Sequence, residues 1–160
     1  MRATRVLKPA ERGNRQVADT VILDYVQRSI RTATVTGLKG GRFEVALAQA
    51  ARLRTDDALL LEDGSLIEVV AAPEPLIEAR AADVAGLARL AWHLGDRHIP
   101  VQMLPNRIRA QRGSAVESLL KSLGAKVTAI DAPFEPEGGA YESHAHDHGH
   151  AHGHHDHHDH

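Results

Sequence analysis

The segment 144–160 limits what this chain can fold into, because it cannot contribute to a packed core. It contains ten His, three Asp, two Ala and two Gly, so it has almost no apolar surface to bury. A folded core must therefore come from the residues before it. Apolar residues make up 42% of the chain and aromatic residues only 3%, which predicts an aliphatic core of Leu, Val, Ile and Ala.

Several classes of protein are disfavoured by composition. No stretch approaches the roughly 18 uninterrupted apolar residues of a membrane span, and residues 1–14 carry charges throughout, unlike a secretory signal. The chain has no cysteine, which excludes disulfides and thiolate metal sites and leaves imidazole and carboxylate ligands. We therefore expect a cytoplasmic protein.

The net charge points to neither nucleic acid nor membrane as a partner. The whole chain carries −2 with His neutral, and the segment 144–160 contributes −3 through its three Asp, so residues 1–143 carry −2 minus −3, or +1. A surface that binds polyanions would need a larger positive balance.

Residues 1–72 predict a small all-β domain. Short runs rich in β-branched and apolar residues are separated by glycines and polar clusters, at residues 20–25, 32–35, 42–47 and 58–61. The clearest hairpin spans residues 59–70, where the pair Asp63-Gly64 suits a tight turn that requires positive φ.

A second domain is predicted over residues 76–132, after a break at Pro73 and Pro75. Candidate strands at residues 76–81, 99–104, around Ile108 and at 126–130 alternate with two stretches of helical spacing. The order strand, helix, strand, strand, helix, strand is that of the ferredoxin-like βαββαβ fold. The expected class is therefore α+β, with residues 133–160 forming a linker and a disordered histidine-rich tail.

Each predicted helix carries start and stop signals. Asp83 is placed to cap the first helix and Gly95 to end it. Ser114 and Glu117 form the S-x-x-E pattern of a capping box at the start of the second helix, and Gly124 is its expected stop.

The tail predicts a binding site for transition-metal ions. Neutral imidazole is the commonest protein ligand for late first-row metals, and the interleaved Asp residues can add carboxylate oxygens or orient an imidazole. At two to four imidazoles per ion, the tail would serve roughly two to five ions. A purification tag or a solvated tail without a metal role are the alternatives, although the interrupted spacing is unlike a tag. The predicted ligands are His144, His146, His148, His150, His152, His154, His155, His157, His158 and His160.

The motif WHLGDRHIPVQMLP, residues 92–105, resembles the UreE family of urease accessory proteins. In that family a helix ends in H-L-G-N-R-H and a strand follows; here Asp96 replaces the usual Asn. The resemblance extends back through residues 62–78 and forward through residues 114–127, and a histidine-rich tail is also common in the family. The first strands fit the family's β domain only loosely.

The resemblance implies a nickel metallochaperone rather than an enzyme. It implies a two-domain subunit that forms a homodimer, in which His98 and its symmetry mate help to bind one nickel ion. A two-fold axis doubles the ligand count of a single imidazole. The implied partners are the urease accessory GTPase and the apo-urease complex. Ni(II) is cargo, and Zn(II), Co(II) or Cu(II) are expected to bind the same ligands.

The residues close to His98 in the sequence are expected to have structural roles. His93 falls in the last turn of the predicted helix, where an imidazole can cap carbonyls or interact with the helix dipole. Asp96 and Arg97 are expected to hold the loop by bonding to nearby backbone, with a second-shell role for Asp96 as the alternative. Many family members carry histidines before the second helix; residues 107–117 have none, so any auxiliary metal site there is absent or moved to the tail.

Three other functions have less support in the sequence. An enzyme lacks support, since the chain has no nucleophile elbow, phosphate loop or H-E-x-x-H motif. A general histidine-rich store or buffer of divalent metals would explain the tail but not the folded domains. RNA binding is suggested by Arg107, Arg109 and Arg112, which lie on or beside a candidate strand. The segment lacks aromatic residues that stack on bases, so a charged, solvated edge strand is the preferred interpretation.

Overall fold

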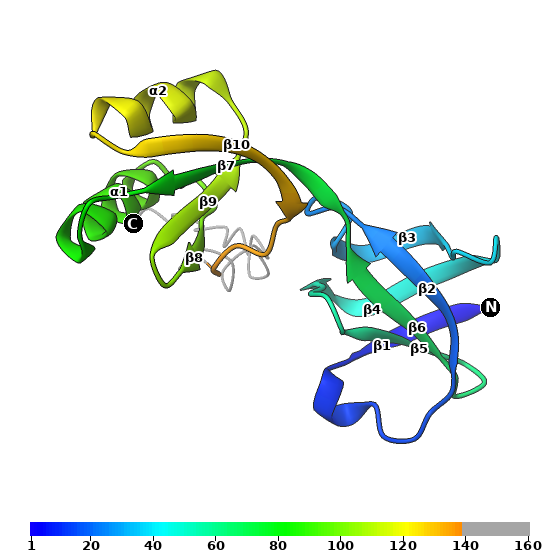
Figure 1. The fold of residues 1–160 in the computed structure, drawn as a ribbon. Helices are drawn as coiled ribbons and strands as arrows, with labels where there is room; N and C mark the ends of the chain where they lie inside the picture. Colours follow the sequence, from blue (N-terminus) through cyan, green and yellow to red (C-terminus); the bar gives the residue numbers. More distant parts are fainter. Residues whose placement is uncertain (139–160) are drawn as a thin grey trace, which may run out of the picture.

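The computed structural model describes residues 1–138, and the predicted histidine tail lies outside these described residues. Within them, ten strands form a six-stranded and a four-stranded sheet, and two α-helices pack on the second sheet (Figure 1). The predicted α+β class is confirmed. In this described part of the chain, neither helix is long and apolar enough to cross a membrane.

The first sheet has the strand order β2-β6-β5-β1-β4-β3. Strand β1 runs parallel to β4 and β2 runs parallel to β6, while the other neighbours are antiparallel. A short 3₁₀ helix, η1, lies between the first two strands. The bounds are β1 Arg2–Leu7, η1 Pro9–Glu11, β2 Val17–Leu23, β3 Ser29–Thr36, β4 Arg42–Arg52, β5 Ala58–Leu61 and β6 Leu66–Ala71.

The core of this sheet is aliphatic, as the composition predicts; Val21, Val45, Leu59 and Val69 are among its buried residues. The predicted hairpin is confirmed as β5 and β6, and Gly64 at its turn has φ of 86°. The sequence did not predict β1, because a register shift interrupts the two-residue alternation on which the prediction depends.

The second sheet confirms the ferredoxin-like prediction. Its strand order is β10-β7-β9-β8, so the two strands that follow the helices, β8 and β10, lie at its edges, as in a βαββαβ unit. All neighbouring strands are antiparallel. Helices α1 and α2 cover one face through buried Leu90, Leu94 and Leu120. The bounds are β7 Pro73–Arg80, α1 Val84–Asp96, β8 Gln102–Leu104, β9 Arg107–Gln111, α2 Ser114–Ser122 and β10 Lys126–Pro133.

Two local predictions for this sheet were wrong. Helix α2 has Gly113 as its N-cap and therefore no side-chain capping bond, and Glu117 pairs with Lys121 at 2.8 Å. The predicted capping box is therefore absent. Strand β9 is not a solvated edge strand, since it lies between β7 and β8, and its arginines bond to a carboxylate on β7.

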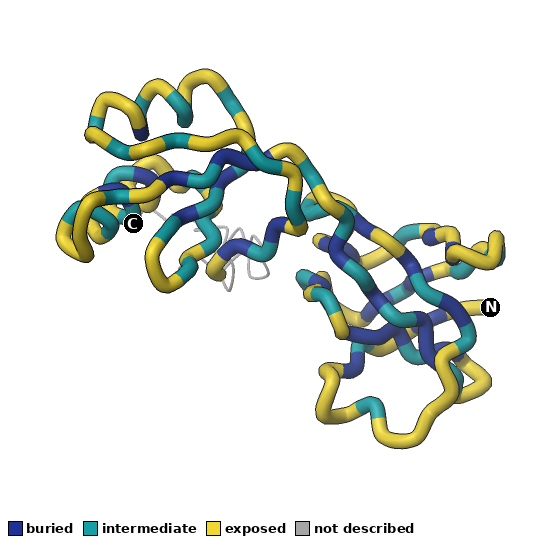
Figure 2. Tube along the Cα trace, viewed as in Figure 1, coloured by how far each residue is buried: buried dark blue, intermediate teal, exposed yellow. Residues whose placement is uncertain are grey.

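The segment after β10, predicted as the start of a linker, packs against both sheets. Phe134 is fully buried, and its ring meets that of Tyr25 edge-on at 5.3 Å between centroids. The buried Arg28 guanidinium donates to the Phe134 carbonyl and pairs with Glu135 at 3.4 Å. Figure 2 shows this buried stretch between the two sheets. The linker prediction missed these contacts because they join residues far apart in sequence.

Candidate metal centre

Helix α1 positions the first candidate ligand, and its own start is well fixed. Asp83 is the N-cap, as predicted, and its carboxylate accepts a hydrogen bond from the Gly86 N–H at 2.7 Å. This bond satisfies one of the four backbone donors that a helix leaves unpaired at its start. Leu90 and Leu94 then anchor the helix on the sheet. The loop that follows α1 is therefore held from a rigid element.

Helix α1 ends at Asp96 with Arg97 as its C-cap, and not at Gly95. The His98 N–H donates to the Gly95 carbonyl at 3.0 Å, and the Ile99 N–H donates to the Leu94 carbonyl at 3.0 Å. This pair of bonds is the Schellman motif, and its left-handed residue is His98, with φ of 55°. The sequence prediction of a stop at Gly95 was wrong because a glycine is not required for this conformation. The predicted strand at 99–104 begins only at Gln102 because Ile99 closes the motif.

This conformation presents the His98 side chain at the surface. His98 is exposed, and a non-glycine residue at positive φ is uncommon; the only other case among residues 1–138 is Asp56. The left-handed region costs an L-residue about 1 kcal/mol or more. Backbone outliers of this kind cluster at functional sites. His98 therefore places an exposed imidazole at a rigid helix end.

His93 lies in the last turn of α1, as predicted, and is less exposed than His98. Its ring is half-buried and meets the ring of Trp92 edge-on at 5.0 Å between centroids. Its carbonyl accepts a hydrogen bond from the Arg97 guanidinium at 3.1 Å, so Arg97 holds the loop to the backbone as expected.

The exit of the tail lies beside the same loop. The Glu137 N–H donates to the Val101 carbonyl at 2.8 Å, and the Glu135 N–H donates to the Gln102 side chain at 3.2 Å. Val101 is three residues from His98, so about 11 Å of chain at most separates them. His144 is seven residues beyond Glu137, which gives it a reach of about 25 Å. The ten tail histidines themselves lie outside the described residues.

The described residues bring no complete metal site together within one subunit. Residues 1–138 hold no group of three or more His, Asp or Glu side chains placed to share an ion. His93 and His98 are the only two histidines before the tail. Because such metals take four to six ligands, a metal ion at His98 would need further ligands from the tail or from another chain.

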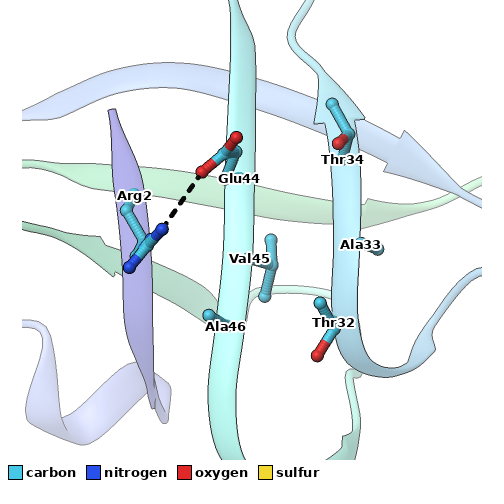
Figure 3. A pocket seen from close by; sticks show the side chains of 7 residues that line it. All are labelled: Arg2, Thr32, Ala33, Thr34, Glu44, Val45 and Ala46. Carbon is cyan, nitrogen blue, oxygen red and sulfur yellow. Dashed lines mark hydrogen bonds and ion pairs between the residues drawn. The ribbon is translucent and has the colours of Figure 1, made fainter.

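A surface hollow across β1, β3 and β4 offers no alternative centre (Figure 3). Its volume is about 290 Å³, and its charged lining residues, Arg2 and Glu44, pair with each other at 3.5 Å. None of its lining side chains is a histidine. The hollow lacks the imidazoles that a nickel or zinc site needs.

A charged cluster on the second sheet was missed by sequence reasoning. Glu78 on β7 accepts a hydrogen bond from the Arg109 Nε at 3.1 Å, and it pairs with Arg107 at 3.1 Å and Arg80 at 3.3 Å. Burial alone would raise the pKa of Glu78, but the Arg109 hydrogen bond and the three nearby guanidinium charges outweigh it and lower that pKa. Alternation of charge along β7 and β9 was the signal that could have located it.

Comparison with known proteins confirms the resemblance stated from the sequence. The family model for the UreE urease accessory protein N-terminal domain matches residues 3–72, and the model for its C-terminal domain matches residues 74–160. A urease accessory protein UreE of Bradyrhizobium sp. (strain ORS 278) is 53% identical over 148 residues, which cover 91% of this chain and 70% of that protein. The protein of that name in Chelativorans sp. (strain BNC1) is 45% identical over 146 residues, or 91% of this chain and 90% of its own.

Proposed function

Since the chain belongs to the UreE family of urease accessory proteins, we propose that it binds nickel and delivers it for assembly of the urease active site. An accessory protein is not urease itself, and the proposed chemistry is reversible binding of a cargo ion rather than catalysis. The observation that carries this proposal is His98, exposed and held in the left-handed conformation at the end of α1.

Two copies of the chain would complete the proposed site. A two-fold axis through the His98 loops would bring two imidazoles to one ion, although each chain supplies only one of them. Tail histidines would supply the remaining positions, because their attachment point at Glu137 lies within reach of His98. The homodimer and the shared ion belong to the proposal.

The tail has a separate part in this proposal. Its ten imidazoles would collect ions weakly, since ordering a long chain segment opposes binding. The rigid His98 pair would bind one ion more tightly and hold it for transfer. The proposed recipients are the urease accessory GTPase and the apo-urease complex, in the cytoplasm. Zinc, cobalt and copper(II) would bind the same ligands.

A general store of divalent metal is the second candidate, and the tail favours it. The two functions depend on different sites. A store needs the capacity of the tail, whereas a chaperone needs one site that binds an ion tightly and can pass it on. Both bind nickel, so nickel binding alone does not separate them. Co-purification with urease or its assembly proteins favours delivery.

Calorimetric titration with nickel tests the proposal on four forms: the intact chain, a chain ending at Ser143, His98→Ala and His93→Ala. Truncation should remove most of the capacity. His98→Ala should keep most of the capacity and weaken the tightest site by about 100-fold, since even second-shell changes cost 10- to 100-fold. His93→Ala is the matched control and should change neither value. If the tightest affinity survives in His98→Ala, then His98 is not a ligand.

A further inference from the structure

The face of the second sheet opposite the helices carries an unbalanced positive charge. Ile77, Ala79 and Ile108 point into the helix-covered core, so the residues that alternate with them point to the other side. These include Arg80 on β7, and Arg107 and Arg109 on β9. Lys126 on β10 lies directly opposite Arg80 in the strand pairing and therefore shares this face.

Only one carboxylate in the described part of the chain pairs with these cations. Glu78 bonds to all three arginines, and it is 12% exposed, so it lies beneath them rather than in front of them. Glu74 lies on the same side of β7 by this alternation, so four positive charges against two negative charges leave a surplus of +2. Arg80 is 47% exposed, and Lys126 is also exposed, so part of this surplus faces solvent. We call Arg80, Arg107, Arg109 and Lys126 the basic face.

The tail leaves the described structure beside this face. After β10 the chain turns back, and its described part ends next to β8, which neighbours β9 (Figure 1). The hydrogen bond from Glu135 to Gln102 fixes the crossing, and Gln102 is paired in register with Arg109. Strands lie about 4.8 Å apart, so the chain needs only about 10 Å to pass from β8 to β7. Twenty-two further residues follow, at about 3.3 Å each.

The charge of that remaining segment complements the basic face. Residues 139–160 contain Glu142, Asp147, Asp156 and Asp159 and no Lys or Arg, which gives −4 with His neutral. Each divalent ion bound to the tail adds +2, so two ions bring it to zero and a third makes it positive. The same segment would therefore be attracted to the basic face without metal and repelled from it with metal.

We propose that the basic face binds the chain's own metal-free tail, and that loading the tail with divalent ions releases it. The contact itself needs only charge; its release by metal depends on the proposed metal binding by the tail. Linkage requires the effect to be reciprocal: attachment to the basic face weakens the first metal-binding step by the same factor by which metal weakens attachment. An unloaded tail would thus lie on the sheet, and a loaded tail would be free to meet a recipient.

The contact is tested in the metal-free, full-length chain by NMR of the Arg107 and Arg109 Nε–H groups. A tail variant with Glu142→Gln, Asp147→Asn, Asp156→Asn and Asp159→Asn keeps all ten histidines but loses the charge. At about 20 mM salt these resonances should differ between wild type and the tail variant, and about 300 mM salt should remove the difference, because screening shortens the range of the attraction. Identical spectra at low salt would overturn the proposal and leave the proposed function intact.

Release is tested with zinc, which is diamagnetic. Three equivalents should move the wild-type resonances to the positions of the tail variant. If zinc does not bind the chain at all, the proposed metal function fails while the contact stands. If zinc binds and the resonances do not move, release is wrong. A response to a random oligonucleotide, without any effect of the tail variant, would assign the face to nucleic acid and also overturn the proposal.

Reciprocity is tested by calorimetry on Arg80→Gln/Lys126→Gln. This pair avoids the two arginines that lie closest to Glu78. Loss of the attachment should tighten the first zinc-binding step about fivefold at low salt and leave it unchanged at high salt. The matched control is Arg89→Gln/Lys121→Gln, which removes the same charge from exposed positions on the two helices. If the two pairs have equal effects, the change in zinc affinity follows from net charge alone, which contradicts a specific contact.

Discussion

Helices α1 and α2 end in the same way but with different residues. At the end of α2, the Gly124 N–H donates to the Lys121 carbonyl at 3.0 Å and the Ala125 N–H to the Leu120 carbonyl at 3.1 Å. This is the Schellman geometry seen at the end of α1, where His98 takes the place of the glycine. Glycine is the usual residue in this position because it has no Cβ to clash. The α2 end follows that preference, whereas the α1 end does not.

The two left-handed residues differ in φ, and the difference explains how a histidine is accommodated. His98 has φ of 55°, inside the narrow left-handed region open to L-residues, whereas Gly124 has φ of 82°, outside it. The α1 end therefore admits a side chain at a moderate cost, and the α2 end does not. A side chain in a position where glycine is favoured needs a reason beyond folding. The proposed metal-binding role of the His98 imidazole would supply one.

The largest effect is expected for Gly124→Ala. A Cβ there meets no atom within 4 Å, so the loss comes from the backbone alone. We expect the free energy of unfolding to fall by about 1–2 kcal/mol, measured by urea denaturation. Gly95→Ala is the matched control, because Gly95 lies inside α1 and its added Cβ also meets open space. It should cost nothing, since alanine favours a helix. Equal losses in both variants would contradict the assignment of the helix ends.

The next effect concerns the helix starts, where the contrast is reversed. Asp83 caps α1 with a hydrogen bond of 2.7 Å, and α2 has no side-chain cap. Asp83→Ala should lower the free energy of unfolding by about 1 kcal/mol, measured in the same way. Asp83→Ser is the control and should recover most of the loss, because serine caps about as well. If Asp83→Ala leaves the free energy of unfolding unchanged, then packing against the sheet alone fixes the start of α1.

A smaller effect of opposite sign is expected for His98→Gly. Relief of the left-handed strain should exceed the entropy that glycine loses on folding, so stability should rise by about 0.5 kcal/mol. The tightest nickel site should weaken at the same time. His98→Asn separates the two effects, because asparagine tolerates this conformation but lacks the imidazole. It should leave stability unchanged and weaken nickel binding; unchanged nickel binding in both variants would contradict a functional reason for His98.

Local patterns predicted most of the fold, and long-range contacts account for most of what was missed. The succession of strands and helices along the second domain, the cap at Asp83 and the stop at Gly124 depend on spacing within a few residues, which a sequence displays directly. The packing of the segment after β10 depends on Arg28, which is 106 residues from the Phe134 carbonyl that it contacts. No local pattern indicates such a pair.

The candidate site was predicted in part for a similar reason. The resemblance identified His98, but nothing in the letters around it shows that it, rather than Gly95, adopts positive φ. The anchoring of the tail beside Val101 also comes from tertiary structure. The tail histidines remain a prediction from composition.

The smallest effect is expected for Ser114→Ala, and its size distinguishes the two accounts of how α2 begins. A capping box would make the serine hydroxyl a backbone acceptor, and its loss would cost about 1 kcal/mol. In the structure Gly113 is the N-cap and Ser114 is the first helical residue, so we expect a change within about 0.3 kcal/mol by urea denaturation. Gly113→Ser is the complementary variant: it places a hydroxyl at the cap itself, where it should match or exceed the stability of the wild type. A loss near 1 kcal/mol in Ser114→Ala would restore the capping box and with it a start for α2 as well defined as that of α1.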